Sequence, residues 1–238
     1  MSDLKVDGII ASTGTNTALT LQGKGTGKVD IGDGALSFPD ADGDADQVIK
    51  TDGSGTLAFV TPAAGGAWNM SGTAVASGSA SLTITGLDST YDTYAIELSD
   101  IILGTTQANS WFRLGDSGGI DSGGTDYEYT TTGWSGSGSV QSGVSTGAAQ
   151  ILLNADSGIA AGTGAGHCGS FKISQPGDST MYTMINGLMS IVGTAGDVEN
   201  AVICSSRNAV ITHTQVQYLP STGTITTGRM TVWGLAHA

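Results

Sequence analysis

The feature that most constrains the fold of this chain is a succession of short segments in which apolar and polar residues alternate. The succession begins near Trp68 and continues to the C-terminus, and residues 81–85 and 94–98 show it most clearly. A period of two residues is typical of a β-strand with one buried face, and we find no helical period. The predicted strands are residues 81–85, 94–98, 111–114, 127–130, 151–153, 171–174, 181–185, 188–192, 201–204, 215–219 and 230–235.

Turn-forming residues separate these segments. Residues 176–178 and 220–223 combine proline with glycine, which is typical of tight turns. Asn186-Gly187 lies between two apolar segments and predicts a two-residue hairpin, because both residues of such a turn need positive φ. Many short strands joined by turns predict an all-β domain of two antiparallel sheets, a β-sandwich with a jelly-roll-like form.

Composition narrows the class of protein further. The chain has 38 glycines among 238 residues, without the strict period of collagen, and 39% hydrophobic residues, enough for a core. Its net charge is −13 with only 8 lysines and arginines, so it lacks the basic surface that nucleic acid or an anionic membrane requires. No apolar run reaches the ~20 residues of a membrane span. The first ten residues do not resemble a signal peptide, so we expect synthesis in the cytoplasm without membrane insertion or export.

Residues 1–61 differ from the rest in having few large side chains. Strands this short cannot bury a core within one chain, because even a two-stranded hairpin is marginal in water. We therefore expect residues 1–61 to form an extended glycine-rich β arm that pairs with other copies or docks on another protein. An unstructured tail is the alternative. Residues 62–66 are then a hinge and residues 67–238 the sandwich head. The short apolar pairs of the arm are Leu19/Leu21, Val29/Ile31, Leu36/Phe38 and Leu57/Phe59.

The arm carries acidic residues at alternate positions, Asp40, Asp42, Asp44 and Asp46. An EF-hand calcium loop shows this alternation, but it also needs glycine at its sixth position and glutamate at its twelfth. Counted from Asp42, those positions hold a glutamine and a glycine, so the EF-hand is excluded. We predict a solvated turn without a metal, with a cation site shared between chains as the alternative.

The cysteines and histidines lack the spacing of a metal site or a disulfide framework. Cys168 and Cys204 lie among apolar or small residues, which predicts two buried free thiols, with one disulfide as the alternative. His167 and His213 have no neighbours at the spacing of zinc ligands. We expect no cofactor and no metal.

Catalytic motifs are also lacking, since the chain has no Gly-x-Ser-x-Gly nucleophile elbow. A glycoside hydrolysis mechanism needs two carboxylates, and Asp126 and Glu128, which flank Tyr127, should point to one face of a strand. Nothing in the sequence selects them over the other carboxylates. Surface solubility is the simpler role for them. We predict that the protein is not an enzyme.

Four aromatic residues lie close together in the sequence, among glycine, serine and threonine: Trp111, Tyr127, Tyr129 and Trp134. Aromatic rings among small polar residues suit stacking on carbohydrate, and they equally suit a sandwich core or a subunit interface. They are our candidates for ligand or interface residues.

Several stretches resemble bacteriophage virion proteins. Residues 4–33, LKVDGIIASTGTNTALTLQGKGTGKVDIGD, are similar to the start of tail-fibre-like proteins of marine and aquatic phages. Residues 36–62, LSFPDADGDADQVIKTDGSGTLAFVTP, resemble a recurrent phage fibre segment that contains QVLKTDGSG. Residues 84–101, 126–134 and 227–236 are similar to a globular β domain at the distal ends of phage tail proteins.

The resemblance implies a homotrimeric virion structural protein, assembled in the host cytoplasm, with intertwined arms and jelly-roll-like heads. It implies that Leu36, Phe38, Leu57 and Phe59 form the trimer neck. The arm would bind other virion proteins of the capsid or tail, and the head would bind a host-surface glycan. We expect a tail fibre, head fibre or spike for host attachment. The alternatives are a capsid decoration (cement) protein that stabilises the head and a glycan-cleaving spike.

Overall fold

The structure is a computed structural model that describes residues 30–31, 36–39, 43–61, 67–155 and 158–236. The chain divides into two compact units, Met1–Ala64 and Gly65–Ala238. The described residues form strands, turns and loops without a helix, so the prediction of an all-β protein is confirmed.

The first unit contains two small antiparallel pairs of strands. One joins β1 (Asp30–Ile31) to β2 (Leu36–Ser37), and the other joins β3 (Val48–Thr51) to β4 (Leu57–Val60). The turn between β3 and β4 is held by Asp52, whose Oδ1 accepts hydrogen bonds from the backbone N–H groups of Ser54, at 2.7 Å, and Thr56, at 3.1 Å. These hydrogen bonds favour the carboxylate and hold the pKa of Asp52 below its usual value.

The hairpin of β3 and β4 leaves apolar side chains in contact with solvent. All four residues of β3 are exposed, and Val48 and Ile49 are each 48% exposed. On β4, Leu57 and Phe59 are half-buried, and the Phe59 ring lies against Gly43. Phe38 is also half-buried, whereas the side chain of Leu36 lies outside the described residues. Asp40 and Asp42 lie outside them too, and Asp44 and Asp46 are exposed.

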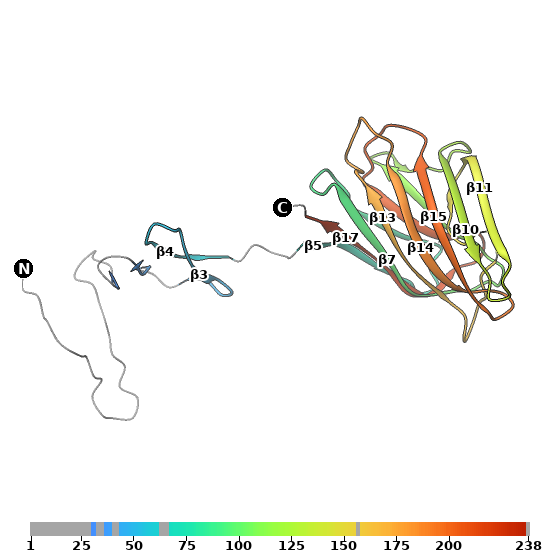
Figure 1. Ribbon diagram of the computed structural model, residues 1–238, viewed down its shortest axis with the longest axis horizontal. Coiled ribbons are helices and arrows are strands. Elements are labelled where there is room, and N and C mark those ends of the chain that lie inside the picture. Colours follow the sequence, from blue (N-terminus) through green and yellow to red (C-terminus); the bar gives the residue numbers. More distant parts are fainter. Residues whose placement is uncertain (1–29, 32–35, 40–42, 62–66, 156–157, 237–238) are drawn as a thin grey trace, which may run out of the picture. The chain divides into compact units, whose positions relative to one another are not determined.

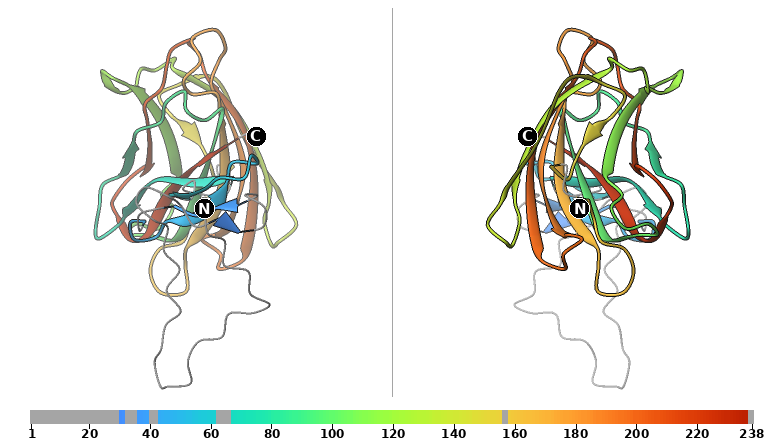
Figure 2. Two further views of the ribbon diagram at one scale, coloured as in Figure 1. Left: turned by 90° about the vertical axis from the view of Figure 1, so that its left-hand side faces the viewer. Right: turned by 90° about the vertical axis from the view of Figure 1, so that its right-hand side faces the viewer.

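The second unit contains two antiparallel sheets (Figures 1 and 2). The larger sheet has eight strands in the order β11-β10-β15-β14-β13-β7-β17-β5, and the smaller has five, β12-β8-β16-β6 with β9 beside β8. The strands are β5 (Trp68–Val75), β6 (Leu82–Thr85), β7 (Thr93–Leu103), β8 (Ser110–Asp116), β9 (Gly119–Ile120), β10 (Tyr127–Trp134), β11 (Val140–Ala148), β12 (Ile151–Leu152), β13 (His167–Ser174), β14 (Met184–Val192), β15 (Val198–Arg207), β16 (Gln215–Pro220) and β17 (Ile225–Leu235).

The hydrophobic core lies between these two sheets. Phe112 of the smaller sheet meets Phe171 of the larger sheet edge to face, with ring centroids 4.8 Å apart. Tyr218 packs against the same Phe112 ring, at 6.0 Å. Aromatic rings at these separations prefer such edge-to-face contacts. The second unit is therefore a β-sandwich, as the alternating segments predicted.

The predicted hairpin at Asn186-Gly187 is wrong. Both residues lie inside β14, which pairs in register with β13 on one side and β15 on the other. A Cβ on Gly187 would lie 2.6 Å from Cδ1 of Phe171, so this glycine makes room for the ring of Phe171 in the core. Packing and two strand ladders outweigh the local turn preference of the pair.

Candidate functional site

The four candidate aromatic residues do not form one site. Trp111 lies on β8 in the smaller sheet, while the other three lie on β10 in the larger one. Successive side chains of a strand point to opposite faces, so Tyr127 and Tyr129 point toward the smaller sheet and Trp134 points away from it. Tyr127 is fully buried, Trp111 and Tyr129 are half-buried, and Trp134 is 57% exposed.

Tyr127 belongs to a buried polar network with a structural role. Its hydroxyl donates to the carbonyls of Leu114 and Asp121, both at 3.0 Å, and accepts from the N–H of Leu114 at 2.8 Å. The Arg207 guanidinium lies over its ring, 5.5 Å from the centroid. Burial raises the pKa of Tyr127 well above its usual value, so the hydroxyl stays protonated.

The carboxylates of Asp126 and Glu128 have separate surroundings. Asp126 Oδ1 forms an ion pair with Nη2 of Arg207 at 3.2 Å, and Asp121 Oδ2 pairs with Nε of the same arginine at 2.9 Å. Glu128 is exposed on the other face of the larger sheet, where its Oε1 accepts a hydrogen bond from Ser206. Asp126 thus serves to fix the loop before β10 to the end of β15.

A second buried network joins the two sheets through a histidine. Nε2 of His167 lies 2.6 Å from the Tyr218 hydroxyl and 3.2 Å from Ser110 Oγ, and those two oxygens are 2.8 Å apart. Burial lowers the pKa of His167 to about 3, so the ring is neutral at physiological pH. All three side chains are buried, and their hydrogen bonds tie the two sheets together.

His213 is buried on the segment that leads into β16. Neither of its ring nitrogens has a hydrogen-bond partner among the described residues. Burial lowers its pKa to about 4. Protonation of either buried histidine therefore lowers the stability of the folded state.

Both cysteines are exposed free thiols, so the prediction that they are buried is wrong. Cys168 on β13 and Cys204 on β15 point away from the core, in phase with their exposed strand neighbours. The two cysteines lie on the face of the larger sheet that the smaller sheet does not cover, whereas Ile203, next to Cys204, faces the core. Among the described residues, no group of three or more His, Cys, Asp or Glu side chains could hold a metal ion.

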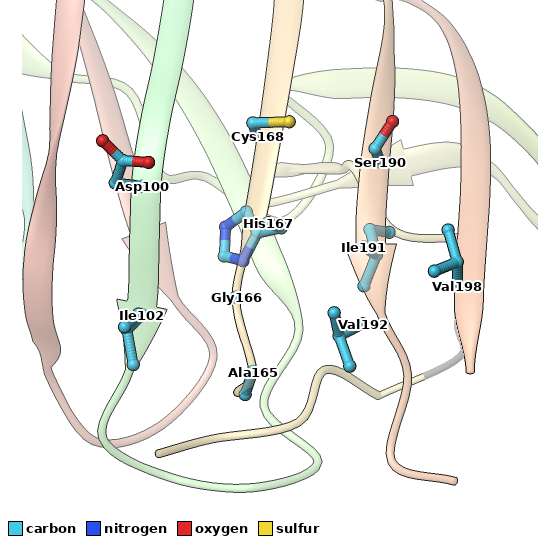
Figure 3. A pocket seen from close by; sticks show the side chains of 10 residues that line it. All are labelled: Asp100, Ile102, Ala165, Gly166, His167, Cys168, Ser190, Ile191, Val192 and Val198. Atoms are coloured by element: carbon cyan, nitrogen blue, oxygen red, sulfur yellow. The ribbon is translucent and has the colours of Figure 1, made fainter. Parts of the chain in front are cut away.

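A hollow of about 390 Å³ lies at one end of β7, β13, β14 and β15 (Figure 3). Its wall includes the apolar side chains of Ile102, Val192 and Val198. Its polar lining residues are Asp100, His167, Cys168 and Ser190, of which Cys168 and Ser190 are direct neighbours across β13 and β14. A mostly apolar wall with a few polar groups suits an apolar side chain.

The most unusual surface is the outer side of β14, β15, β10 and β11, which lie side by side in the larger sheet (Figure 1). Six apolar side chains point outward there and are between 55% and 74% exposed. We call this surface the apolar face and define it by Trp134, Val140, Val144, Leu188, Val198 and Val202. The same face of these four strands carries one charged residue, Glu128.

Continuous apolar runs in the sequence indicate the apolar face. Residues 201–204 are apolar at every position, as are most of residues 188–192. A strand with one solvated face alternates, whereas a strand covered on both faces reads as a continuous apolar run.

Comparisons of the chain with protein-family models, with characterised proteins and with solved structures found no significant match. None of the described residues forms a helix long and apolar enough to cross a membrane.

Proposed function

We propose that this chain is a non-enzymatic structural protein of a bacteriophage virion, a trimeric fibre or spike. In this proposal the arm of residues 1–61 joins three copies and attaches them to capsid or tail proteins. The jelly-roll-like head is displayed for attachment to a host-surface glycan. The resemblance of residues 4–33 and 36–62 to phage fibre proteins supports this assignment.

The observation that carries the proposal is the exposed hairpin of β3 and β4. An isolated two-stranded hairpin is marginally stable in water and gains stability when a further layer covers it. The described residues of its unit provide no such layer over Val48 and Ile49, which stay 48% exposed. Pairing with the same hairpin of other copies, or docking on a virion protein, would cover them.

Deleting residues 1–61 tests the anchoring role. We expect the shortened chain to keep the far-ultraviolet circular dichroism of a β-sandwich and to be missing from assembled particles. The full chain, expressed in parallel, is the control and should be incorporated. Incorporation of the shortened chain at the same level would refute the anchoring role.

The capsid decoration protein is the second candidate, because an exposed apolar hairpin could equally lie across coat subunits. Copy number per particle separates the two. A fibre requires on the order of tens of trimers or fewer, whereas decoration of every capsid joint requires hundreds of chains, each gaining affinity from multivalency. Quantitative gel analysis of purified particles gives this number.

The glycan-cleaving spike receives less support from the geometry. A glycosidase needs two carboxyl groups that flank one glycosidic bond. Asp126 is bound to Arg207, and Glu128 lies on the opposite side of the sheet. A depolymerase activity that is present in the protein and lost in both Asp126→Ala and Glu128→Ala would overturn the non-enzymatic assignment.

A further inference from the structure

The apolar face contains two apolar pairs on neighbouring strands. Leu188 of β14 lies directly opposite Val202 of β15, and Trp134 of β10 lies directly opposite Val140 of β11. Val198 and Val202 point to the same side of β15, and Asn200 between them is the strand neighbour of Trp134. Diagonal neighbours of this kind are within reach of a large aromatic side chain, so the Trp134 ring can bridge the two pairs.

The outer side of these strands is somewhat smaller than one side of a standard protein interface. Four strands spaced ~4.8 Å apart and about nine residues long cover a rectangle of about 600 Å². Polar side chains lie between the six apolar ones within it. A standard protein complex buries ~800 Å² per partner, so a partner seated here would also contact residues beyond these strands. Hollows of about 390 and 370 Å³ border the face at opposite ends and could receive side chains from a partner.

The lack of charge on this face allows a second copy of this chain to be the partner. Copies that each carry a net charge of −13 repel one another, and the repulsion is smallest where the facing surfaces are uncharged. The four strands of the apolar face present only Glu128. A basic partner protein would bind an acidic surface, and this face is not acidic.

The exposed edge strand of the larger sheet also supports a second copy of this chain as the partner. β11 is an edge strand of nine residues, and its sequence VQSGVSTGA has neither charge nor proline. Exposed uncharged edge strands promote pairing with other chains, and natural proteins usually protect them with charged residues or a covering element. A neighbouring copy over Val140 and Val144 would provide that cover.

We infer that neighbouring copies of this chain cover the apolar face in the assembled protein. The inference rests on the proposed assembly and deepens it, because it places a head-to-head interface on β14, β15, β10 and β11. The arms then join the copies, and the heads pack together through this face.

Cys204 is a natural reporter for this interface. It points outward on β15, two residues from Val202, and it is exposed in the single chain. In the full-length protein at assembly concentrations, a neutral maleimide should label Cys204 at least about tenfold more slowly than in variants that separate the heads. Mass spectrometry of the peptide distinguishes Cys204 from Cys168.

Two single variants separate the heads by placing a charge on the face, Trp134→Glu and Val198→Glu. Both side chains are more than half exposed and lie several residues from Cys204 along or across the sheet, so the chemistry of its thiol is unaffected. The matched control is Val210→Glu, at an exposed valine outside the sheets, which should keep Cys204 protected. Circular dichroism confirms that each variant is folded.

The outcomes separate this inference from the proposed function. A trimer by sedimentation whose Cys204 is protected in the parent and control and free in the two variants supports both. A trimer whose Cys204 reacts equally fast in all four proteins overturns the inference, keeps the arm-based assembly and leaves the face open to another partner. A monomer whose Cys204 reacts freely overturns both.

Discussion

The two faces of β14 and β15 have similar side chains and opposite surroundings. The inner face carries Ile185, Met189 and Ile203, which are at most 1% exposed beneath the smaller sheet. The outer face carries Leu188 and Val202, more than half exposed. Both faces therefore carry large apolar side chains, although Asn186, Ser190 and Asn200 lie among them on the outer face. Large apolar side chains gathered on one exposed surface are typical of an interaction site, which is why we propose that another copy covers the outer face.

The largest expected difference between the two faces is in the effect of an introduced charge. We expect Ile203→Asp to prevent folding, since it buries an unpaired carboxylate in the core at a cost of several kcal/mol. The adjacent Val202→Asp should leave the head folded and, in the chain without residues 1–61, dissociate the copies, because its side chain enters solvent once the heads separate. Circular dichroism and sedimentation measure the two effects. Equal loss of folding in both variants would contradict the difference between the faces.

The glycine that admits Phe171 offers a smaller test of the inner face. A Cβ at Gly187 would lie 2.6 Å from Cδ1 of Phe171 and close to the carbonyl of Ser170. We expect Gly187→Ala to lower the free energy of unfolding by about 1–3 kcal/mol, the usual cost of overpacking. Asn186→Ala, which faces outward next to it, should change this free energy by less than about 0.5 kcal/mol. Urea unfolding gives both values, and a neutral Gly187→Ala would argue against the tight packing.

The inner side should also make stability depend on pH. The pKa values of His167, about 3, and His213, about 4, lie below the ordinary 6.5, so the unfolded chain binds more protons than the folded chain. Their contribution is therefore complete above about pH 6.5 and is lost as the pH falls toward 4 and then 3. In the steepest part of that range, each histidine should remove about 1.4 kcal/mol per pH unit.

Urea unfolding at pH 7 and pH 5 measures this dependence. His213→Leu removes one of the two titrating groups and should reduce the loss of free energy between these pH values by roughly half. An unchanged loss in the variant would show that His213 is protonated without penalty in the folded protein.

The smallest expected effect concerns Glu128, the single charged residue that the four strands present on the apolar face. Glu128→Gln removes repulsion between copies while keeping an oxygen that can accept the hydrogen bond from Ser206. We expect it to strengthen assembly by about 0.2–1 kcal/mol, the size of an exposed charge interaction. Glu97→Gln on β7, outside those four strands, is the matched control and should change the affinity less. Sedimentation at several concentrations compares them, and weaker assembly of Glu128→Gln would count against this arrangement of the copies.

Alternation predicted most strands of the sandwich because a half-buried strand carries its apolar residues on one side. It failed for β11, whose valines point outward and whose inward positions hold Gln141, Gly143 and Ser145. The strands could be predicted where apolar side chains face the core. They could not be predicted where, as in β11, the apolar side chains face away from the core.

The candidate site was harder to predict than the fold. Closeness in sequence suggested that Tyr127 and Trp134 act together, but their positions seven residues apart fall on opposite faces of one strand. The same uncertainty of phase affected Cys204, because an apolar run does not reveal which of its residues meet the core. Asn186-Gly187 shows a third difficulty. The pair is typical of a turn, but the sequence does not reveal that Gly187 is needed to make room for the ring of Phe171 in the core.

The central claim is that copies of this chain assemble, and sedimentation equilibrium of the full-length protein tests it most directly. We expect a single species with three times the mass of the 238-residue chain, and removal of the arm together with Trp134→Glu should convert it toward the monomer. A full-length protein that sediments with the mass of one chain at all accessible concentrations would contradict it.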